Sequence, residues 1–380
     1  MRIPPRTTTS RYCSHSAPRT IPPPRPRPSN ASTTATPFAR SPSTDPSRSP
    51  DAGPLPTGGG GDACALSGRD RSLKAFTLTT AGATPALLDR PAPSPAAGQI
   101  LVRVHASSVN ALDVGIALGR FEQMGIPHQY PLTLGRDMAG VVESIGQDAG
   151  AFAVGDRVFG EIPFRPPISA GTWAEYALVD HRNLARVPDA IDLVTAGAAP
   201  LAAVTAIQLV DALDLAAGQT VLIVGATGGV GSIAAQLATA VGATVVAPGL
   251  PGDEQFLRQL GVADIWHRDD DLVAAVRDRH PRGVDAIIDA VTPYQLTAYE
   301  AALGDGGRIT SPTNAAGEGP GRTNVMHTPT TTLLDRVAGY LADGTIAVAI
   351  QRIYTLDQAN GALQAFRSGH TLGKIAIQIS

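Results

Sequence analysis

The pattern of apolar and polar residues changes character along the chain. From Lys74 onward, short segments such as Leu101–His105 alternate apolar and polar positions, which is the pattern of a half-buried strand. Further short strands are predicted at Gly140–Glu143 and Asp156–Phe159, and glycines separate these segments. Many short strands divided by glycine turns predict a β-rich, partly barrel-like domain.

Beyond about Pro200 the pattern becomes a regular alternation of helices and apolar strands. Polar residues and Pro200 interrupt the apolar run Ala196–Leu213, so it predicts a buried, alanine-rich helix and not a membrane span. After it, strands are predicted at Thr220–Val224, Thr244–Ala247, Ala263–Trp266, Ala286–Ala290 and Arg308–Thr310, and helices at Val230–Val241, Glu254–Leu260 and Asp271–Arg279. This alternation predicts a parallel, doubly wound sheet. Strand-like segments around one helix, Leu356–Phe366, close the chain.

The first 72 residues have a different composition from the rest. The first sixty contain fourteen prolines and eight arginines but only two acids, Asp45 and Asp51. Such a segment buries too little apolar surface to offset its chain entropy, so we expect a disordered basic leader over 1–72. Three interpretations stay open: an inert tail with translation starting near Leu73, a functional linker, or a targeting segment, although its prolines oppose an amphipathic helix.

Charge and cysteine content narrow the functional classes. The formal net charge is −3, which argues against a dedicated nucleic-acid binder. Both cysteines, Cys13 and Cys64, precede the predicted folded part, which excludes a disulfide framework and a cysteine-ligated structural zinc. We therefore expect a cytoplasmic protein without a membrane or nucleic-acid partner.

The strongest motif is the glycine turn between Val224 and the helix that follows it. The residues Gly225-Ala226-Thr227-Gly228-Gly229-Val230-Gly231 join a buried strand directly to a helix, the context in which such a motif is credible. Gly228 lets the backbone approach a pyrophosphate, the helix N-terminus attracts its charge, and Gly231 allows close packing on the strand. The turn therefore predicts a dinucleotide site, against the alternative of a glycine-rich turn that binds nothing.

The end of the second predicted strand bears on the choice of dinucleotide. NAD-binding proteins place an Asp or Glu there to hold the ribose 2′-hydroxyl. The segment Val245–Leu250 has no acid, so nothing would repel the 2′-phosphate of NADPH. The nearest base is Arg258, on the following helix. NADPH is the cofactor that this pattern favours.

With these residues in view, the chain resembles the medium-chain dehydrogenase/reductase superfamily from about Leu73 to Ser380. The matching segments occur in family order and include the glycine turn; the others are Val109–Asp113, Pro131–Gly140, Val154–Gly160, Gly171–Tyr176 and Leu372–Ile375. The resemblance implies an α/β protein with a β-rich GroES-like catalytic domain over 73–197 and 335–380. It also implies a doubly wound Rossmann domain over 198–334, a cleft between the two, and a homo-oligomer.

Zinc-dependent relatives need a cysteine shortly before Asn110 and a His-Glu pair after Gly135. Here the first region is Ala106-Ser107-Ser108-Val109 and the pair is Arg136-Asp137. Arginine cannot be deprotonated to ligate a metal, so we expect no catalytic zinc. The chain therefore resembles the zinc-independent quinone oxidoreductases.

The resemblance also places individual residues near the nicotinamide. Asn110 is the predicted catalytic residue, with a loop cap as its alternative role. Thr205 is predicted to contact the cofactor, or else to bond its own helix backbone. The other predicted cofactor contacts follow strands or close the chain: Ala226, Thr227, Gly228, Gly229, Val230, Gly231, Ala290, Val291, Ser311 and Lys374. For Lys374 the alternative is a surface cation.

Two positions near Asn110 limit the resemblance. Asp113 is expected to be a structural cap in preference to a base. Some quinone oxidoreductases have a tyrosine two residues beyond it, where this chain has Gly115, so the proton donor is not identified. The sequence thus predicts NADPH-dependent reduction of quinones or other α,β-unsaturated carbonyls. An enoyl-thioester reductase and a non-enzymatic NADPH-binding protein are the alternatives. The predicted substrate pocket is lined by the loops Phe121–Tyr130 and Glu161–Ala170.

Overall fold

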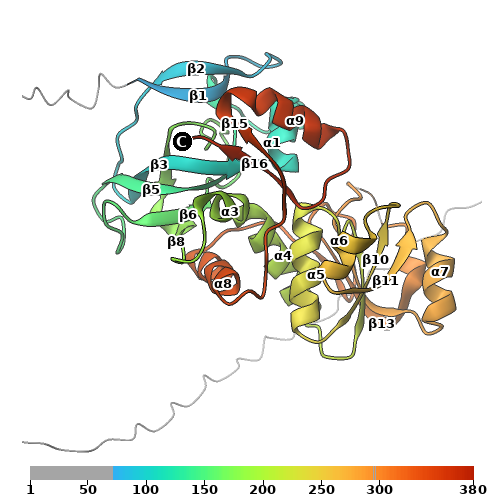
Figure 1. The fold of residues 1–380 in the computed structure, drawn as a ribbon. Helices are drawn as coiled ribbons and strands as arrows, with labels where there is room; N and C mark the ends of the chain where they lie inside the picture. Colours follow the sequence, from blue (N-terminus) through green and yellow to red (C-terminus); the bar gives the residue numbers. More distant parts are fainter. Residues whose placement is uncertain (1–71, 294, 296) are drawn as a thin grey trace, which may run out of the picture. The chain divides into compact units, whose positions relative to one another are not determined.

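The computed structural model describes residues 72–293, 295 and 297–380, all within one compact unit, Ala63–Ser380 (Figure 1). Apart from Ser72, the predicted leader lies outside the described residues, as do Cys13 and Cys64. Among the described helices, none is long and apolar enough to cross a membrane.

The N-terminal half forms a seven-stranded sheet with the end of the chain. Its strand order is β15-β16-β3-β5-β6-β8, and β7 pairs with β3. The bounds are β3 Gln99–Ser108, β5 Asp137–Ile145, β6 Arg157–Glu161, β7 Tyr176–Asp180, β8 Leu184–Arg186, β15 Ile350–Thr355 and β16 Lys374–Gln378. Along β3, Ile100, Val102 and Val104 are fully buried while Arg103 between them is exposed, as the alternating pattern predicts.

Shorter elements cover this sheet. A three-stranded sheet has the order β2-β1-β4, with β1 Ser72–Leu78, β2 Ala86–Pro91 and β4 Leu132–Thr133. The helical elements in this part are α1 Ala111–Ala117, α2 Arg120–Gln123, η1 His181–Asn183, η3 Leu356–Gln358 and α9 Ala359–Arg367. Trp173 is completely buried and contacts Phe76 of β1, which anchors the small sheet in the core.

The second large sheet is parallel and has the order β11-β10-β9-β12-β13-β14. Its strands are β9 Thr220–Val224, β10 Thr244–Gly249, β11 Val262–His267, β12 Val284–Asp289, β13 Leu303–Ser311 and β14 Arg322–Asn324. Successive residues of β9 enter two different core clusters, Val221 and Ile223 on one face and Leu222 and Val224 on the other. Helices cover both faces, which explains the unbroken apolar run and confirms the doubly wound α/β class.

Three helices of this part follow the predicted alternation, and a fourth, α8, was not predicted. They are α5 Gly229–Ala240, α6 Glu254–Gln259, α7 Leu272–Arg279 and α8 Thr331–Ala342, with the short turn η2 Glu300–Ala302.

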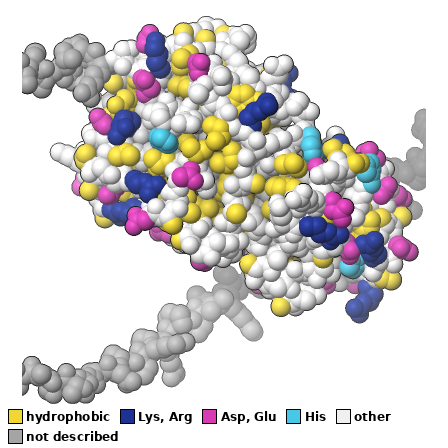
Figure 2. Space-filling model, in the orientation of Figure 1, with side chains coloured by type: hydrophobic (Ala, Val, Ile, Leu, Met, Phe, Trp, Pro, Cys, Tyr) yellow, Lys and Arg dark blue, Asp and Glu magenta, His cyan; other side chains and the backbone are white. Residues whose placement is uncertain are grey.

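On the face drawn in Figure 2, cationic and anionic side chains are interspersed, in keeping with a net charge of −3.

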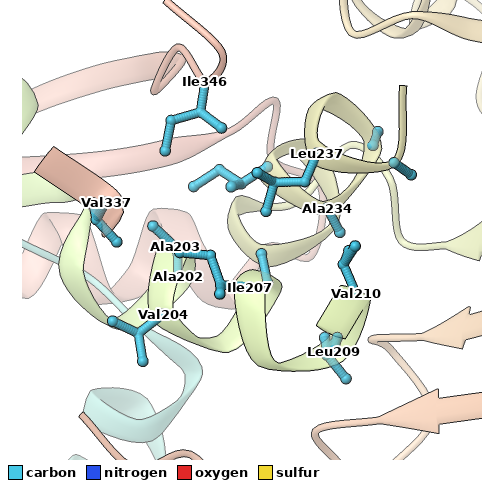
Figure 3. Packing of buried hydrophobic residues seen from close by; sticks show 14 of the residues in the cluster. Ala202, Ala203, Val204, Ile207, Leu209, Val210, Ala234, Leu237, Val337 and Ile346 are labelled. Carbon is cyan, nitrogen blue, oxygen red and sulfur yellow. The ribbon is translucent and has the colours of Figure 1, made fainter. Parts of the chain in front are cut away.

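The predicted helix Ala196–Leu213 is in fact two helices, α3 Leu193–Ala198 and α4 Pro200–Leu213. Proline has no amide hydrogen to donate, and Pro200 occupies the first turn of α4, where that loss costs least. Helix α4 contacts β5 and β6 of one sheet and β13 of the other. Figure 3 shows its apolar side chains, Ala203, Ile207 and Val210 among them, gathered with those of α5 and α8.

Candidate functional site

The glycine turn forms the N-terminus of α5 at the carboxyl end of β9. Gly225 has a φ of +87°, and a Cβ on Gly231 would lie 2.1 Å from Gly225 O, so both positions require glycine. Gly228 is the N-cap of α5, and no side chain caps the helix there. A Cβ on Gly228 would meet only Gly225 O, at 3.5 Å. The helix N-terminus is therefore uncapped and open to an approaching anion.

The start of β16 closes one side of this turn. Gly373 N donates to Thr227 O (2.7 Å), and Gly228 and Gly373 form an isolated parallel bridge. A Cβ on Gly229 would lie 2.6 Å from Cδ of Lys374, so Gly229 is needed for packing against that side chain. Thr227, Gly228, Gly229 and Val230 stay partly exposed, whereas Ala226 and Gly231 are buried beneath them. The predicted turn residues thus divide into a lining layer and a supporting layer.

The ends of β12 and β13 adjoin the turn. The buried carboxylate of Asp289 accepts hydrogen bonds from Val291 N and Thr292 N, both at 3.0 Å, and fixes the loop after β12. Val291 is 57% exposed, and one of its methyl carbons lies 2.5 Å from where a Cβ on Gly225 would be.

Ser311 holds the neighbouring loop in a similar way. Its hydroxyl oxygen accepts from Thr313 N (3.0 Å) and Ala315 N (3.1 Å). Thr313 Oγ1 in turn donates to Thr292 O (2.5 Å), which joins the two loops. Structure and prediction agree that Ala290, Val291 and Ser311 lie at the carboxyl edge of the sheet, beside the glycine turn. Their contact with a cofactor stays a prediction.

Asn110 and Lys374 meet in a buried polar cluster. Lys374 Nζ donates to Asn110 Oδ1 (2.6 Å) and lies 3.4 Å from Asp137 Oδ2, and Asn110 Nδ2 donates to that same carboxylate oxygen at 2.9 Å. Lys374 is only 4% exposed, so it is not a surface cation. Asp137 also accepts from Ser108 Oγ (2.5 Å) and Leu201 N (2.7 Å). The cluster connects the seven-stranded sheet to the start of α4.

Asp113 and Arg136 are buried beside this cluster. Asp113 Oδ2 accepts from Asn110 N (2.8 Å), so Asp113 caps the start of α1 and Asn110 also has the structural role considered for it. Burial raises the pKa of Asp113 to about 7; the charge of Arg136 opposes that rise and the charge of Asp137 adds to it. Arg136 donates to Ala170 O (2.6 Å), and its Nε has no hydrogen-bond partner.

The side chains of Arg136 and Asp137, which stand where zinc-dependent relatives have a His-Glu pair, do not fit zinc. Arg136 has no lone pair to offer a metal, and the oxygens of Asp137 are already bound by four donors. Across the part of the chain that the structure describes, no group of three His, Cys, Asp or Glu side chains is arranged to hold a metal ion.

Thr205 joins a second buried group that the sequence did not reveal. Thr205 Oγ1 donates to Leu201 O (2.6 Å), the backbone bond considered as its alternative role, and it also lies 2.9 Å from His327 Nδ1. His327 Nε2 lies 2.9 Å from both oxygens of Glu161, whose side chain is 1% exposed. Glu161 directly follows the family segment Val154–Gly160, but nothing in the sequence relates it to His327. Their meeting depends on the contact between β6, α4 and the segment after β14.

The end of β10 has no acid free to hold a ribose. The first acid after it, Asp253, is buried, accepts from Leu250 N (2.8 Å) and pairs with His370 (2.9 Å). Arg258, the nearest base in sequence, donates to backbone carbonyl oxygens of Val262 and Ala263. Arg268, exposed and next after β11, lies closer to the end of β10, because its amide donates to Gly249 O (2.8 Å).

The two loops predicted to line the substrate pocket contact each other. Gln129 N donates to Ile168 O and Ile168 N donates to Pro127 O, both at 2.9 Å. The rings of Phe121 and Phe164 lie 4.8 Å apart between their centroids. A Cβ on Gly115 would lie 2.5 Å from the Phe121 ring, so this ring occupies the space in which a larger residue at 115 would sit.

The comparisons with known proteins agree with this architecture. Residues 96–189 match the alcohol dehydrogenase GroES-like domain, and residues 260–377 match the zinc-binding dehydrogenase family. Erythronolide synthase EryA2 of Saccharopolyspora erythraea is 34% identical over 296 residues, 74% of this chain but 8% of the synthase. Human quinone oxidoreductase is 31% identical over 221 residues, 57% of this chain and 65% of that protein.

A solved structure has a similar fold. A mycobacterial protein complexed with NADPH superposes with a TM-score of 0.70 and 27% identity, over 81% of this chain and 100% of that one.

Proposed function

We propose that this chain, which belongs to the quinone-oxidoreductase-like group of the medium-chain dehydrogenase/reductase superfamily, reduces quinones or other α,β-unsaturated carbonyls with NADPH. The observation that carries the proposal is the uncapped N-terminus of α5 at the carboxyl edge of the parallel sheet, with open space over Gly228. A pyrophosphate there would receive backbone N–H groups and the positive end of the helix dipole. The proposed domains are 73–197 with 335–380 and 198–334.

Three features favour NADPH over NADH in this proposal. The end of β10 lacks an acid, and Asp253 is already bound by Leu250 N and His370. Arg268 follows β11 at the same edge and is exposed, so its guanidinium is the candidate partner for a 2′-phosphate. The mycobacterial structural neighbour was solved with NADPH, which supports the same choice.

The chemistry proposed for the site needs no Lewis acid. When bound, NADPH supplies a hydride, and conjugated acceptors spread the developing negative charge over a carbonyl oxygen. Asn110 and Thr205 would border the nicotinamide, and the buried contacts with Lys374 and Asp137 keep the Asn110 amide in one orientation. Phe121 and Phe164 supply an apolar wall for a flat acceptor.

The test combines binding with turnover. Titration of the purified protein with NADPH and with NADH measures both dissociation constants, and a panel of quinones and enones is then assayed for NADPH oxidation with and without chelator. We expect NADPH to bind more tightly and the rate to be insensitive to chelator. Absence of binding to either dinucleotide, or alcohol oxidation that a chelator abolishes, refutes the proposal. Tight binding without turnover of any acceptor would favour a non-enzymatic NADPH-binding protein.

An enoyl-thioester reductase is the second candidate, because the match to the polyketide synthase EryA2 covers more of this chain than the match to human quinone oxidoreductase. A thioester carried on coenzyme A or a carrier protein brings phosphate groups that need cations. The face in Figure 2 mixes both charges and shows no basic groove. Comparing kcat/KM for a free enone, a short enoyl thioester and the same acyl group on coenzyme A separates the two candidates.

The prediction of a homo-oligomer is tested by light scattering.

A further inference from the structure

We propose that His327, held as an imidazolium by Glu161, supplies the proton that completes the reduction and passes it through the hydroxyl of Thr205. This inference rests on the proposed function, which needs one proton for each hydride and for which the sequence offered no donor. It concerns His327 and Glu161, a pair that the sequence did not predict.

The position of His327 in the fold places it at the predicted nicotinamide side. It follows β14, the edge strand of the parallel sheet, after Val325 N has bonded to Ser311 O (2.8 Å). Its Nδ1 lies 2.9 Å from Oγ1 of Thr205. Two of the residues predicted from sequence to face the cofactor, Ser311 and Thr205, thus hold the segment that presents this imidazole.

Glu161 connects the same imidazole to the cluster around Asn110. In the antiparallel register of β5 and β6, Glu161 lies opposite Asp137, whose carboxylate holds the side-chain amide of Asn110. Asp137 also binds Leu201 N, and Leu201 O accepts the proton of Thr205. A continuous set of hydrogen bonds therefore runs around the proposed reaction centre.

The hydrogen-bond partners of His327 fit the proposed imidazolium. The Thr205 hydroxyl has one proton and donates it to Leu201 O at 2.6 Å, so its oxygen is left to accept from His327 Nδ1. The carboxylate of Glu161 can only accept, so Nε2 must donate as well. Both ring nitrogens then carry protons, and the imidazole is a cation paired with a buried carboxylate.

The surrounding charges favour the same state. Burial by itself would lower the pKa of His327, but the charge and hydrogen bond of Glu161, with a smaller contribution from Asp137, raise it above its usual range. Burial raises the pKa of Glu161, and the charges of His327 and Arg136 oppose that rise. The side chain of His327 is 19% exposed, while that of Glu161 is 1% exposed, so the imidazole is the member of the pair that solvent can recharge.

The proposed step balances in atoms and charge. Addition of a hydride to the acceptor leaves an enolate, or a hydroquinone anion, with one negative charge. In this step the Thr205 hydroxyl turns its proton away from Leu201 O, gives it to that anion and takes one from His327 Nδ1. A neutral imidazole is left, still donating Nε2–H to Glu161. A proton from water then restores the imidazolium. One hydride and one proton are consumed in each turnover.

The first experiment does not depend on activity. Nitrogen-15 NMR of the cofactor-free protein follows the protonation of His327 against pH, in the wild type and in Glu161→Gln. We expect both ring nitrogens to be protonated at neutral pH in the wild type, and the titration midpoint to move to lower pH in the variant, because the charge that raises it has been removed. A neutral His327 at pH 7 in the wild type overturns the inference.

The second experiment measures the pH dependence of kcat. We expect the wild-type rate to fall as pH rises through the pKa of His327, this limb to move to lower pH in Glu161→Gln, and His327→Gln to lose the limb and about 10²-fold in kcat. Glutamine at position 327 retains hydrogen bonds to Glu161 and Thr205. If His327 had only a structural role, His327→Gln would therefore leave the pH profile unchanged. His181→Gln is the matched control, because His181 also lies beside an aspartate and bonds Gly98 O (3.0 Å).

The outcomes separate this inference from the proposed function. If the wild type reduces quinones or enones and His327→Gln keeps both its rate and its pH limb, the inference is wrong and the function stands. If the wild type binds no dinucleotide and reduces no acceptor, the function fails, and a proton relay serving it fails with it even when NMR finds the imidazolium. Thermal midpoints of all three variants establish that each is folded.

Discussion

Alanine substitutions at Gly228 and Gly231 test the dinucleotide site from two directions, because the two glycines meet different surroundings. Gly228 has φ −78° and ψ 173°, an extended conformation that alanine adopts without strain, and its added Cβ would meet one atom at 3.5 Å. At Gly231 the added Cβ would lie 2.1 Å from Gly225 O, which is 1.3 Å short of the 3.4 Å at which ordinary contact begins. Backbone must then move at one site and not at the other.

We therefore expect Gly228→Ala to keep its fold and lose cofactor affinity. The methyl group would hold a pyrophosphate away from the helix N-terminus, and weakening one hydrogen bond to a charged group by about 1.5–3 kcal/mol raises the Kd for NADPH by about tenfold or more. Gly231→Ala should lower the thermal midpoint, since such overpacking costs roughly 1–3 kcal/mol or more. Gly339→Ala is the control, because its Cβ would meet nothing within 4 Å. Wild-type NADPH affinity in a folded Gly228→Ala protein would refute the placement of the pyrophosphate.

Three further predictions use other parts of the site. The pKa of Asp113 is about 7 in the fold against 3.8 for a free group, so the folded state binds the extra proton and wild-type stability falls as pH rises from about 4 to 7. The thermal midpoint of Asp113→Asn relative to wild type should accordingly increase between pH 5 and pH 8, and a constant difference contradicts this. Arg268→Ala should raise KM for NADPH and leave KM for NADH unchanged, with Arg258→Ala, whose guanidinium binds the β11 backbone, as control; equal effects on both cofactors refute the assignment. Gly115→Tyr should destabilise the protein unless Phe121→Ala is added, as thermal midpoints of the single and double variants will show.

The parts of the fold that were predictable from sequence are those that one local pattern specifies. The strand Thr220–Val224 was predicted with the bounds it has, because an apolar run followed at once by a glycine turn permits little else. Helix α8 was not predicted, although Leu334, Val337 and Leu341 are its buried residues. These residues have the i, i+3, i+7 spacing of an amphipathic helix, so the sequence pattern does indicate α8. The break at Ala199 was missed because buried alanines continue on both sides of Pro200.

In the candidate site, too, residues that are consecutive in the sequence were predictable, and contacts between distant positions were not. The glycine turn and the strand ends were found because their chemistry lies in consecutive residues. The relation of Asn110 to Lys374 joins positions 264 residues apart, and that of His327 to Glu161 joins positions 166 residues apart. Family resemblance supplied the first pair one residue at a time, and nothing in the sequence supplied the second. Only the packing of β6, α4 and the segment after β14 brings it together.

The three carboxyl groups around position 136 explain why an arginine is accommodated there. Around the proposed reaction centre, cations and carboxyl groups occur in equal number within a region from which water is largely excluded; they are Arg136, His327 and Lys374, with Asp113, Asp137 and Glu161. An unpaired charge in such surroundings costs several kcal/mol. The guanidinium of Arg136 does more than remove a metal ligand, because it acts on all three carboxyl groups. Histidine at position 136 would not rebuild a zinc site by itself. Asp137 would remain bound to Lys374 and Asn110, and the carboxyl groups would lose the one cation that influences them all.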